Sequence, residues 1–406
     1  MGIKRTVILF PAAFLMNISI MMINFAVIFF LKDRVQLSPS VIGLYFAAGS
    51  VGYAGLCLAL RPVQDRIAPP VSMVISIALT IFSLLMMKST TNPYVVFIYY
   101  FIFAAAPAFY WPQVMGWFSY GLNHDELGTA VSRFNISWST GSLCGPLIGG
   151  FIASYDIMLS FYIDLAIIGF IGIILVFGLI FIKDMKEFPR AIRVVGDGPS
   201  THATGLAPDT KKDDLINNGE GTFLRFPGWI GVFSTYIVLG MINNIFPLYI
   251  RDSLNLNETV AGNLLFVRGL VTALGFGLLG KFVNWHFNKK IMLITQGSTV
   301  LILILLLFVK SVFLFYFLFI IYGLLFSMAY SNGIFHGSAG AEARGKRMAL
   351  FESFLTTGTV IGTIIGGYLY QFLSIQIAFA LAAVLVLAGF IVQSVMMKFA
   401  DKHNLK

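Results

Sequence analysis

"FNISWSTGSLCGPLIGG" (residues 134–150) is the stretch that decides the fold, because its pattern returns as "FESFLTTGTVIGTIIGG" (residues 351–367). A glycine inside a helix costs about 1 kcal/mol relative to alanine. In a bilayer, however, small residues at every fourth position let two helices approach closely. We therefore expect two helix-packing faces, with a kink at Pro146 because proline removes a helical hydrogen bond. The faces contain Gly141, Gly145, Gly149 and Gly150 in the first copy, and Gly358, Gly362, Gly366 and Gly367 in the second.

A second pair of similar stretches supports the duplication. "MINFAVIFFLKDRVQLSPSVIG" (residues 22–43) aligns with "MINNIFPLYIRDSLNLNETVAG" (residues 241–262), which places Asp33 on Asp252. The two pairs have nearly the same separation along the chain, so we infer that one half repeats the other. Internal repeats of this kind are typical of secondary transporters, which bind substrate where the repeats meet.

The composition is that of a membrane protein. Of the 406 residues, 58% are hydrophobic and only 11% are charged, whereas a soluble domain has about 25% charged residues. Long apolar runs recur, many of them near the roughly 20 residues that a helix needs to cross a bilayer. Runs so uniformly apolar predict helices rather than barrel strands. The predicted spans are residues 8–31, 39–60, 69–87, 94–120, 129–153, 157–182, 226–250, 259–282, 290–309, 312–336, 346–371 and 375–397.

One segment breaks this pattern. Residues 183–225 mix charged residues with Gly, Pro and Ser, and such a composition cannot bury enough apolar surface to order itself. We predict a flexible linker between two six-helix bundles, residues 1–182 and 226–406. The expected fold class is therefore all-α and polytopic, with twelve transmembrane helices in two pseudo-symmetric bundles.

The net charge is +9, and the distribution of the basic residues indicates membrane topology rather than nucleic-acid binding. The basic residues concentrate in the loops on one side, as the positive-inside rule describes. This predicts an integral protein of the plasma (inner) membrane with both termini in the cytoplasm. We expect a monomer in the lipid bilayer, with no nucleic-acid partner.

Enzyme chemistry is not indicated. The chain has no GxxxxGK[ST] phosphate loop, no HExxH helix and no GxSxG elbow. Cys57 and Cys144 fall inside predicted helices and are interpreted as packing residues rather than a disulfide or metal pair. We expect neither a cofactor nor a metal.

With twelve spans, a central linker and a repeated half, the chain resembles the major facilitator superfamily over essentially its whole length. "GSLCGPLIGG" (141–150) is similar to the glycine-proline motif of the family's antiporters, and "RPVQDR" (61–66) is a partial match to its gating-loop motif. The resemblance implies that Asp65 caps the start of a neighbouring helix, since a carboxylate there is favourable by about 0.3–1 kcal/mol. Alternatively, this is a solvated loop that only sets topology. The gating-loop residues retained in the two halves are Asp65 and Arg66, and Gly280, Lys289 and Lys290.

Two ionisable residues stand out within the spans. A charge at mid-membrane costs at least about 2.5–3.5 kcal/mol, so it calls for a reason. We interpret Arg268 as a cation that binds an anionic group or a carboxylate; the alternative is a structural partner for Asp164. Glu352 is the candidate for proton coupling, because a poorly hydrated carboxylate can exchange a proton as access alternates. The alternative is that Glu352 forms an ion pair with a cation such as Arg133 or Arg347. The predicted proton-coupling residues are Glu352 and Arg133.

The family resemblance implies that helices 1, 4, 7 and 10 line a central cavity. Amides and aromatic rings there can bind an organic solute, although single aromatics are also ordinary lipid-facing residues. The cavity candidates, with Arg268, are Asn17, Asn24, Trp111, Gln113, Asn243, Asn244 and Asn332.

The function we predict is secondary active transport of a small organic solute by alternating access, coupled to protons. The glycine-proline motif favours export by antiport. One alternative is a proton-coupled importer of a sugar, organic acid or peptide. Another, of a different class, is a transporter-like receptor or assembly factor that moves nothing.

Overall fold

The computed structural model describes residues 5–60, 66–119, 124–186, 223–282, 284–339 and 344–402. Its contacts divide the chain into two compact units. The first unit is Met1–Gly196 with Ile250–Phe266, and the second is Asp197–Tyr249 with Val267–Lys406. Every regular element in the described ranges is helical, so the predicted all-α class is confirmed.

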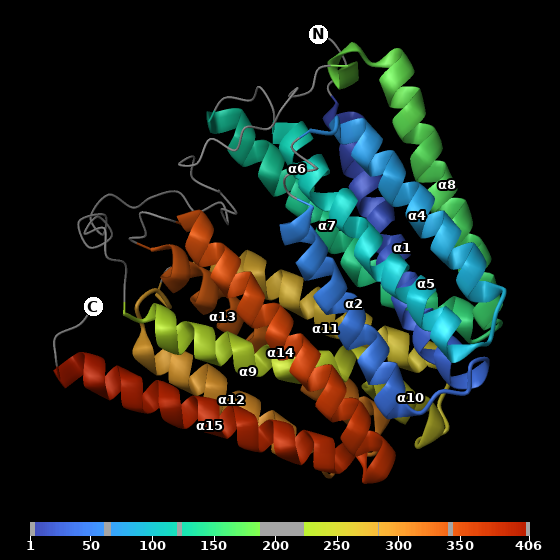
Figure 1. Ribbon diagram of the computed structural model, residues 1–406. Helices are drawn as coiled ribbons and strands as arrows, with labels where there is room; N and C mark the ends of the chain where they lie inside the picture. The colour runs from blue at the N-terminus through green and yellow to red at the C-terminus, as the bar shows by residue number, and fades with distance from the viewer. Residues whose placement is uncertain are drawn as a thin grey trace. The chain divides into compact units, whose positions relative to one another are not determined.

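The first unit contains seven α-helices and two short 3₁₀ helices among its described residues (Figure 1). They are α1 (Thr6–Asp33), α2 (Pro39–Ala59), α4 (Pro69–Lys88), α5 (Pro93–Ala105), η1 (Ala106–Phe109), α6 (Trp111–Ser119), α7 (His124–Ala153), α8 (Ile157–Phe181) and η2 (Lys183–Lys186). Helix α1 packs along α7 and α8.

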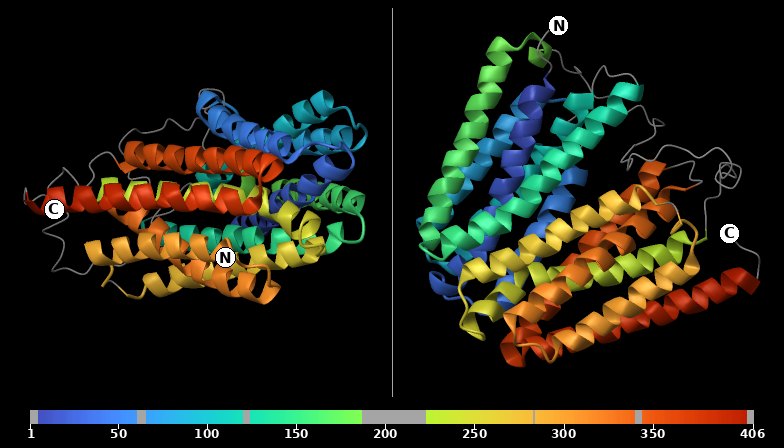
Figure 2. Two further views of the ribbon diagram at one scale, coloured as in Figure 1. Left: turned by 90° about the horizontal axis from the view of Figure 1, so that it is seen from below. Right: turned by 180° about the vertical axis from the view of Figure 1, so that it is seen from behind.

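The second unit is built around α9, which contacts α13, α14 and α15. Its helices are α9 (Arg225–Asn244), α12 (Lys289–Leu306), α13 (Val312–Ser338), α14 (Arg344–Phe372) and α15 (Ile375–Lys402). The unit boundary passes through α10 (Phe246–Asp252) and α11 (Glu258–Leu279). Helices α12 and α15 lie side by side (Figures 1 and 2).

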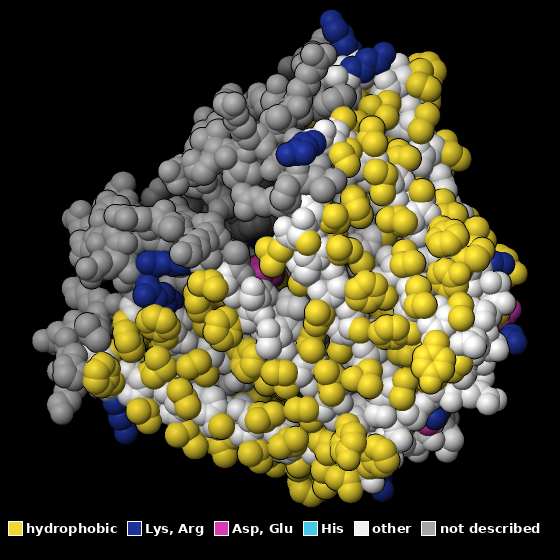
Figure 3. Space-filling view, in the orientation of Figure 1, with side chains coloured by type: hydrophobic (Ala, Val, Ile, Leu, Met, Phe, Trp, Pro, Cys, Tyr) yellow, Lys and Arg dark blue, Asp and Glu magenta, His cyan; other side chains and the backbone are white. Residues whose placement is uncertain are grey.

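Eleven helical stretches of the described residues are long and apolar enough to cross a membrane. Helix α7, with 30 residues, occupies the place of the predicted fifth span. Apolar side chains cover much of the visible surface over α4, α8 and α15, as expected of helices that face lipid (Figure 3). The predicted linker, residues 183–225, lies mostly outside the described residues, and its first four residues form η2.

The fourth and seventh predicted spans are interrupted, which the sequence analysis did not predict. The fourth is divided into α5, η1 and α6, and the seventh into α9 and α10. Pro107, Pro112 and Pro247 lie at these breaks; proline lacks the N–H that continues a helix. In the fourth span, Ser72 and Ser76 of α4 donate to carbonyl groups of η1, each at 2.8 Å.

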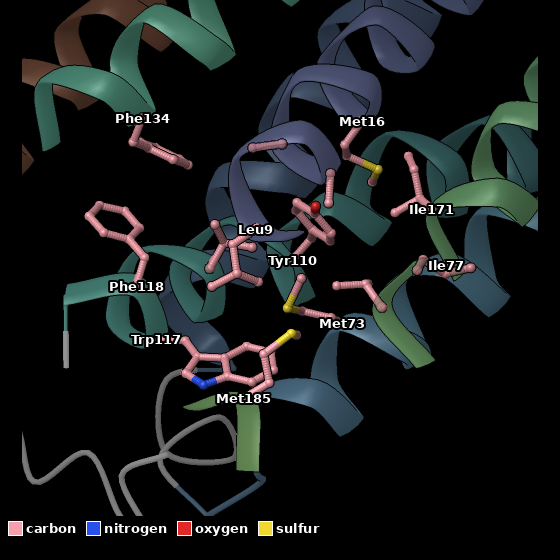
Figure 4. Packing of buried hydrophobic residues seen from close by; sticks show 14 of the residues in the cluster. Leu9, Met16, Met73, Ile77, Tyr110, Trp117, Phe118, Phe134, Ile171 and Met185 are labelled. Carbon is pink, nitrogen blue, oxygen red and sulfur yellow. The ribbon is translucent and has the colours of Figure 1, made fainter. Parts of the chain in front are cut away.

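The core of the first unit gathers apolar side chains from α1, α4, α6, α7 and α8. Figure 4 shows Leu9, Tyr110 and Trp117 at its centre, with Met73 and Met185 beside them. Trp117 and Tyr110 have no exposed surface. The core therefore fixes α6 against α1, and with it the residues at the break in the fourth span.

The glycine faces pack in the same way in the two units. A Cβ on Gly141 would lie 2.5 Å from the carbonyl oxygen of Phe14, and one on Gly358 would lie 2.9 Å from that of Phe233. Phe233 is the repeat partner of Phe14. The next glycines likewise face Ile18 and Met22 of α1 in the first unit, and Ile237 and Met241 of α9 in the second. The duplication therefore extends to individual contacts.

The loops after α1 and α10 also repeat. Gln36 and Asn255 both have positive φ angles, 60° and 54°. In each loop the following leucine N–H donates to a carbonyl six residues earlier, at 2.9 Å and 3.1 Å. Both loops therefore depend on one residue in the left-handed region, which is strained for most side chains.

Candidate functional site

Arg268 is positioned by a close crossing of α11 and α13. A Cβ on Gly323 would lie 2.6 Å from the carbonyl oxygen of Arg268, so only glycine permits this approach. The Thr272 hydroxyl bridges the two backbones, with distances of 2.9 Å to the Arg268 carbonyl oxygen and 3.1 Å to that of Gly323. The backbone that carries the arginine is thereby fixed.

The equivalent crossing in the first unit explains why only one half has an arginine here. Gly49, the repeat partner of Arg268, lies on α2, and its Cβ would be 2.8 Å from the Cβ of Ala104 on α5. The glycine of this crossing is thus Gly49 on α2 in the first half and Gly323 on α13 in the second half. This exchange leaves position 268 open to a long side chain.

The guanidinium of Arg268 has no protein counter-ion among the described residues. Its Nε is buried without a hydrogen-bond partner, and none of the ion pairs in the described ranges involves it. Tyr236 and Tyr322 lie close enough to interact with it electrostatically. Asp164, the alternative partner from the sequence analysis, is fully buried in α8 and also forms no ion pair there.

A cluster of aromatic rings lies beside Arg268; we call it the tyrosine cluster and define it as Tyr236, Tyr322, Phe326 and Tyr330. Phe326 and Tyr330 have ring centroids 6.2 Å apart at an interplanar angle of 13°. Tyr236 of α9 lies 5.4 Å from Phe326 and 6.3 Å from Tyr330. The three α13 members are spaced four residues apart, so they share one helix face.

The hydroxyl groups of the tyrosine cluster differ in their partners. Tyr322 is buried and donates to the carbonyl oxygen of Thr235 at 3.0 Å. Tyr236 and Tyr330 are only partly buried, and within the described ranges their hydroxyls have no hydrogen-bond partner. Two hydroxyls are therefore available to a ligand.

Glu352 lies at the other end of the tyrosine cluster. It is an exposed residue of α14 that interacts electrostatically with Tyr236 and Tyr330. It forms no ion pair with another described residue. Arg133, which the sequence analysis grouped with it, is exposed on α7.

The tyrosines were missing from the predicted site, although Arg268 and Glu352 were in it. The chain has 16 tyrosines and 40 phenylalanines, so an aromatic residue alone carries little information. Two signals could have found them: the four-residue spacing along α13, and the alignment of Tyr236 with Asn17 in the repeat.

The asparagines of α1 and α9 bind neighbouring helices. Asn17 donates to the carbonyl oxygen of Trp138 at 2.8 Å, and Asn24 accepts from the Tyr100 hydroxyl at 3.3 Å. Asn244 donates to Thr363 at 2.9 Å. Asn243 is partly buried. In the structure three of these four amides thus hold helices together.

The remaining cavity candidates are packed within their units. Trp111 lies against the core, edge-on to Tyr110 at 5.2 Å, and Gln113 is buried. Asn332 is buried beside a small internal pocket that Gln296 and Gln393 also line.

The gating-loop residues are only partly described. Asp65 lies outside the described residues, and Arg66 is exposed. Gly280 follows α11, and Lys289 and Lys290 begin α12.

The segment Ile250–Phe266 joins the first unit through an ion network. Arg251 donates to both carboxylate oxygens of Asp33 at 2.6 Å and 2.8 Å. It also lies 2.9 Å from Asp252 and 3.5 Å from Glu258, and 4.7 Å from the ring centre of Phe29. One cation thus connects the end of α1 with α10 and α11.

A close backbone contact accompanies this network. A Cβ on Gly150 would lie 2.7 Å from the carbonyl oxygen of Glu258 and 3.0 Å from the Cα of Gly262. A Cβ on Gly262 would meet the carbonyl oxygen of Pro146. The glycine-proline end of α7 therefore packs directly against the start of α11.

Comparison with known proteins places these features in context. The sequence profile described as Major Facilitator Superfamily matches residues 9–201 and 228–405. No curated protein matches the chain. Among solved structures, a mutant of the nucleoside transporter NupG has a TM-score of 0.75 at 13% identity, covering 96% of this chain and 99% of that one. The structure of NupG itself has a TM-score of 0.73 at 15% identity, covering 98% of this chain and 100% of that one.

Another similar structure is a bacterial homologue of the human lysosomal transporter Spinster, in an inward-facing and occupied conformation. Its TM-score is 0.70 at 11% identity, covering 97% of this chain and 96% of that one. At these identities the likeness concerns the fold alone.

Proposed function

The chain belongs to the Major Facilitator Superfamily of membrane transporters, and we propose that it moves a small organic solute across the membrane by alternating access. The observation that carries this proposal is Arg268, a cation that has no counter-ion among the described residues and interacts electrostatically with Tyr236 and Tyr322 of the tyrosine cluster. A charge inside a membrane protein is costly and typically marks a substrate or ion pathway. We assign Arg268 and the tyrosine cluster to substrate binding.

Glu352 is proposed as the group that couples transport to protons. Its position beside Tyr236 and Tyr330 brings a carboxylate to the same cluster of residues as Arg268. A carboxylate that meets one side of the membrane and then the other can carry a proton in each cycle. Substrate and proton would then compete for one region of the second unit.

Two contacts support a two-state mechanism. The Arg251 network and the Gly150–Gly262 contact hold Ile250–Phe266 against α1 and α7. We propose that both contacts form in one access state and separate in the other. The moving parts would be the halves 1–182 and 226–406, joined by the linker 183–225, with both termini in the cytoplasm of a plasma (inner) membrane.

We propose the direction of transport from the motif in α7. The glycine-proline face that resembles the antiporter motif packs on both α1 and α11, which supports export by antiport from a monomer. The alternative is proton-coupled import of a sugar, organic acid or peptide.

The experiment is a flux measurement with purified protein in proteoliposomes that enclose a pH-sensitive dye. Solutes that raise the thermal stability of the protein would first be selected, since a ligand that binds the folded state stabilises it. Substrate-dependent proton movement across the vesicle membrane supports the proposal. Binding of the same solutes without any flux would instead identify a transporter-like receptor.

A further inference from the structure

We propose that the substrate is a planar aromatic anion, with its acid group on Arg268 and its ring against the tyrosine cluster. This inference rests on the proposed function, because it names the substrate class for the same residues. It is carried by the charge, the ring geometry and the length of the cluster.

Arg268 indicates the charge of the ligand. Arg268 is partly buried and its buried Nε has no partner, and burying part of a charged group without a hydrogen bond is costly. Glu352 does not supply the pairing, because no ion pair joins the two within the described ranges. Guanidinium groups bind carboxylates and related acids through two parallel hydrogen bonds. An anionic group on the ligand therefore completes the site.

The rings of the tyrosine cluster indicate the shape of the ligand. Phe326 and Tyr330 are nearly parallel, at 13°, and Tyr236 and Phe276 approach Tyr330 at centroid distances of 6.3 Å and 5.5 Å. Tyr236 and Tyr330 retain exposed surface. Flat faces of this kind favour a flat ligand, since aromatic pairs gain energy beyond the area they bury.

The length of the cluster limits the size of the ligand. Tyr322, near Arg268, and Tyr330, near Glu352, are eight residues apart on α13, which is roughly 12 Å along the helix axis. One or two fused rings with an acid group fit this length. The hydroxyls of Tyr236 and Tyr330 can then bind polar substituents at the end away from the acid.

The test uses three related probes on the purified full chain. Benzenesulfonate has a ring and a permanent negative charge, benzenesulfonamide keeps the ring without the charge, and cyclohexanesulfonate keeps the charge without the flat ring. We expect benzenesulfonate to raise the melting temperature most and to bind at least about tenfold more tightly than either analogue. Equal binding of all three, or preference for the sulfonamide, would overturn the inference.

Single-residue variants test separately which residue binds the acid group and which binds the ring. Arg268→Gln should weaken benzenesulfonate binding on the order of 10- to 100-fold and leave sulfonamide binding unchanged. Tyr330→Leu should remove the preference over cyclohexanesulfonate, whereas Tyr330→Phe should keep it. Lys310→Gln, an exposed cation between α12 and α13, is the matched control. Melting temperatures without ligand show whether each variant folds. If Arg268→Gln does not fold, Arg268→Lys provides a second test of the charge.

The two proposals can fail separately. Selective binding of benzenesulfonate without flux in proteoliposomes would uphold the ligand class and overturn transport. Flux of a neutral solute, unaffected by Arg268→Gln and without benzenesulfonate binding, would overturn the ligand class and uphold transport.

Discussion

Glu352 is the carboxylate that we propose binds and releases the coupled proton. It has no cationic partner among the described residues and interacts electrostatically with Tyr236 and Tyr330. We expect Glu352→Gln to abolish transport driven by a pH gradient, because the amide cannot exchange a proton. Counterflow exchange, which needs no net proton movement, should continue. Both rates are measured in proteoliposomes.

Glu352→Asp, which keeps the carboxylate, is the conservative control and should retain proton-driven transport. Loss of both activities in Glu352→Gln, with an unchanged melting temperature, would instead assign this residue to substrate binding.

Asp164 supports a second prediction for a single residue. It is fully buried in α8, and the hydroxyl of Ser19 interacts with it without forming a hydrogen bond of standard geometry. Burying a charge costs more than burying a neutral polar group. Asp164→Asn should therefore change the melting temperature little, whereas Asp164→Lys should lower it strongly. A large loss for Asp164→Asn in thermal unfolding would contradict this.

The single residues show what a sequence can reveal. Arg268 and Glu352 are conspicuous because a charge interrupts an apolar run. Asn17 and Asn24 are also polar residues within an apolar run, but in the structure they form hydrogen bonds to neighbouring helices. A polar side chain inside a span can face a cavity or a neighbouring helix, and its residue type does not distinguish the two.

Helix packing gives a prediction for the elements. A Cβ on Gly362 would meet the carbonyl group of Ile237 in α9, whereas a Cβ on Gly277 of α11 would meet nothing within 4 Å. Gly362→Ala should destabilise the protein by about 1–3 kcal/mol, the usual cost of overpacking. Gly277→Ala should be neutral or stabilising by up to about 1 kcal/mol, because alanine favours helix.

Thermal unfolding in detergent compares these two variants. Equal melting temperatures for Gly362→Ala and Gly277→Ala would show that α14 can move away from α9 at little cost. Such a result would contradict the packing described here.

The elements themselves could be predicted with few errors, and the errors have a common cause. Apolar length identifies a span, but it does not show whether the helix is continuous. Pro247 lies at the break in the seventh span. At the break in the fourth, Pro107 and Pro112 are accompanied by Ser72 and Ser76 of α4, which donate to carbonyl groups of η1. Those neighbours are distant in sequence, so the proline alone did not decide the outcome.

Alternating access is tested at the scale of the whole molecule by the Arg251 network. If the network stabilises one access state, Arg251→Gln should shift the population toward the other. Only the Asp33 pair of the network joins the two halves. An ion pair at a partly exposed site contributes about 0.2–1 kcal/mol, so we expect a change of up to about fivefold. Labelling rates of single cysteines introduced near Phe29 measure the shift.

Arg34→Gln is the matched control, since Arg34 is exposed beside Asp33 and forms no ion pair within the described ranges. Identical labelling in Arg251→Gln and Arg34→Gln would remove the network from the mechanism.

The boundary between the two compact units was harder to predict from the sequence than the fold. The repeat and the composition indicate two halves, but they do not show that Ile250–Phe266 packs with the first unit. That grouping comes from Arg251 and from the contact of Gly150 with Gly262. It joins residues far apart along the chain, and no local pattern reports it.

The exchange of the small residue between the two crossings has a consequence for how the halves diverged after duplication. Gly49 with Ala104, and Arg268 with Gly323, are alternative solutions to one steric problem. A side chain introduced at position 49 would meet Ala104 and the ring of Tyr100, with its Cβ at 2.8 Å and 3.1 Å. Each crossing should therefore accept a larger residue only when its neighbours change with it: A104G should lessen the loss of melting temperature caused by G49R without removing it, because Tyr100 stays in place.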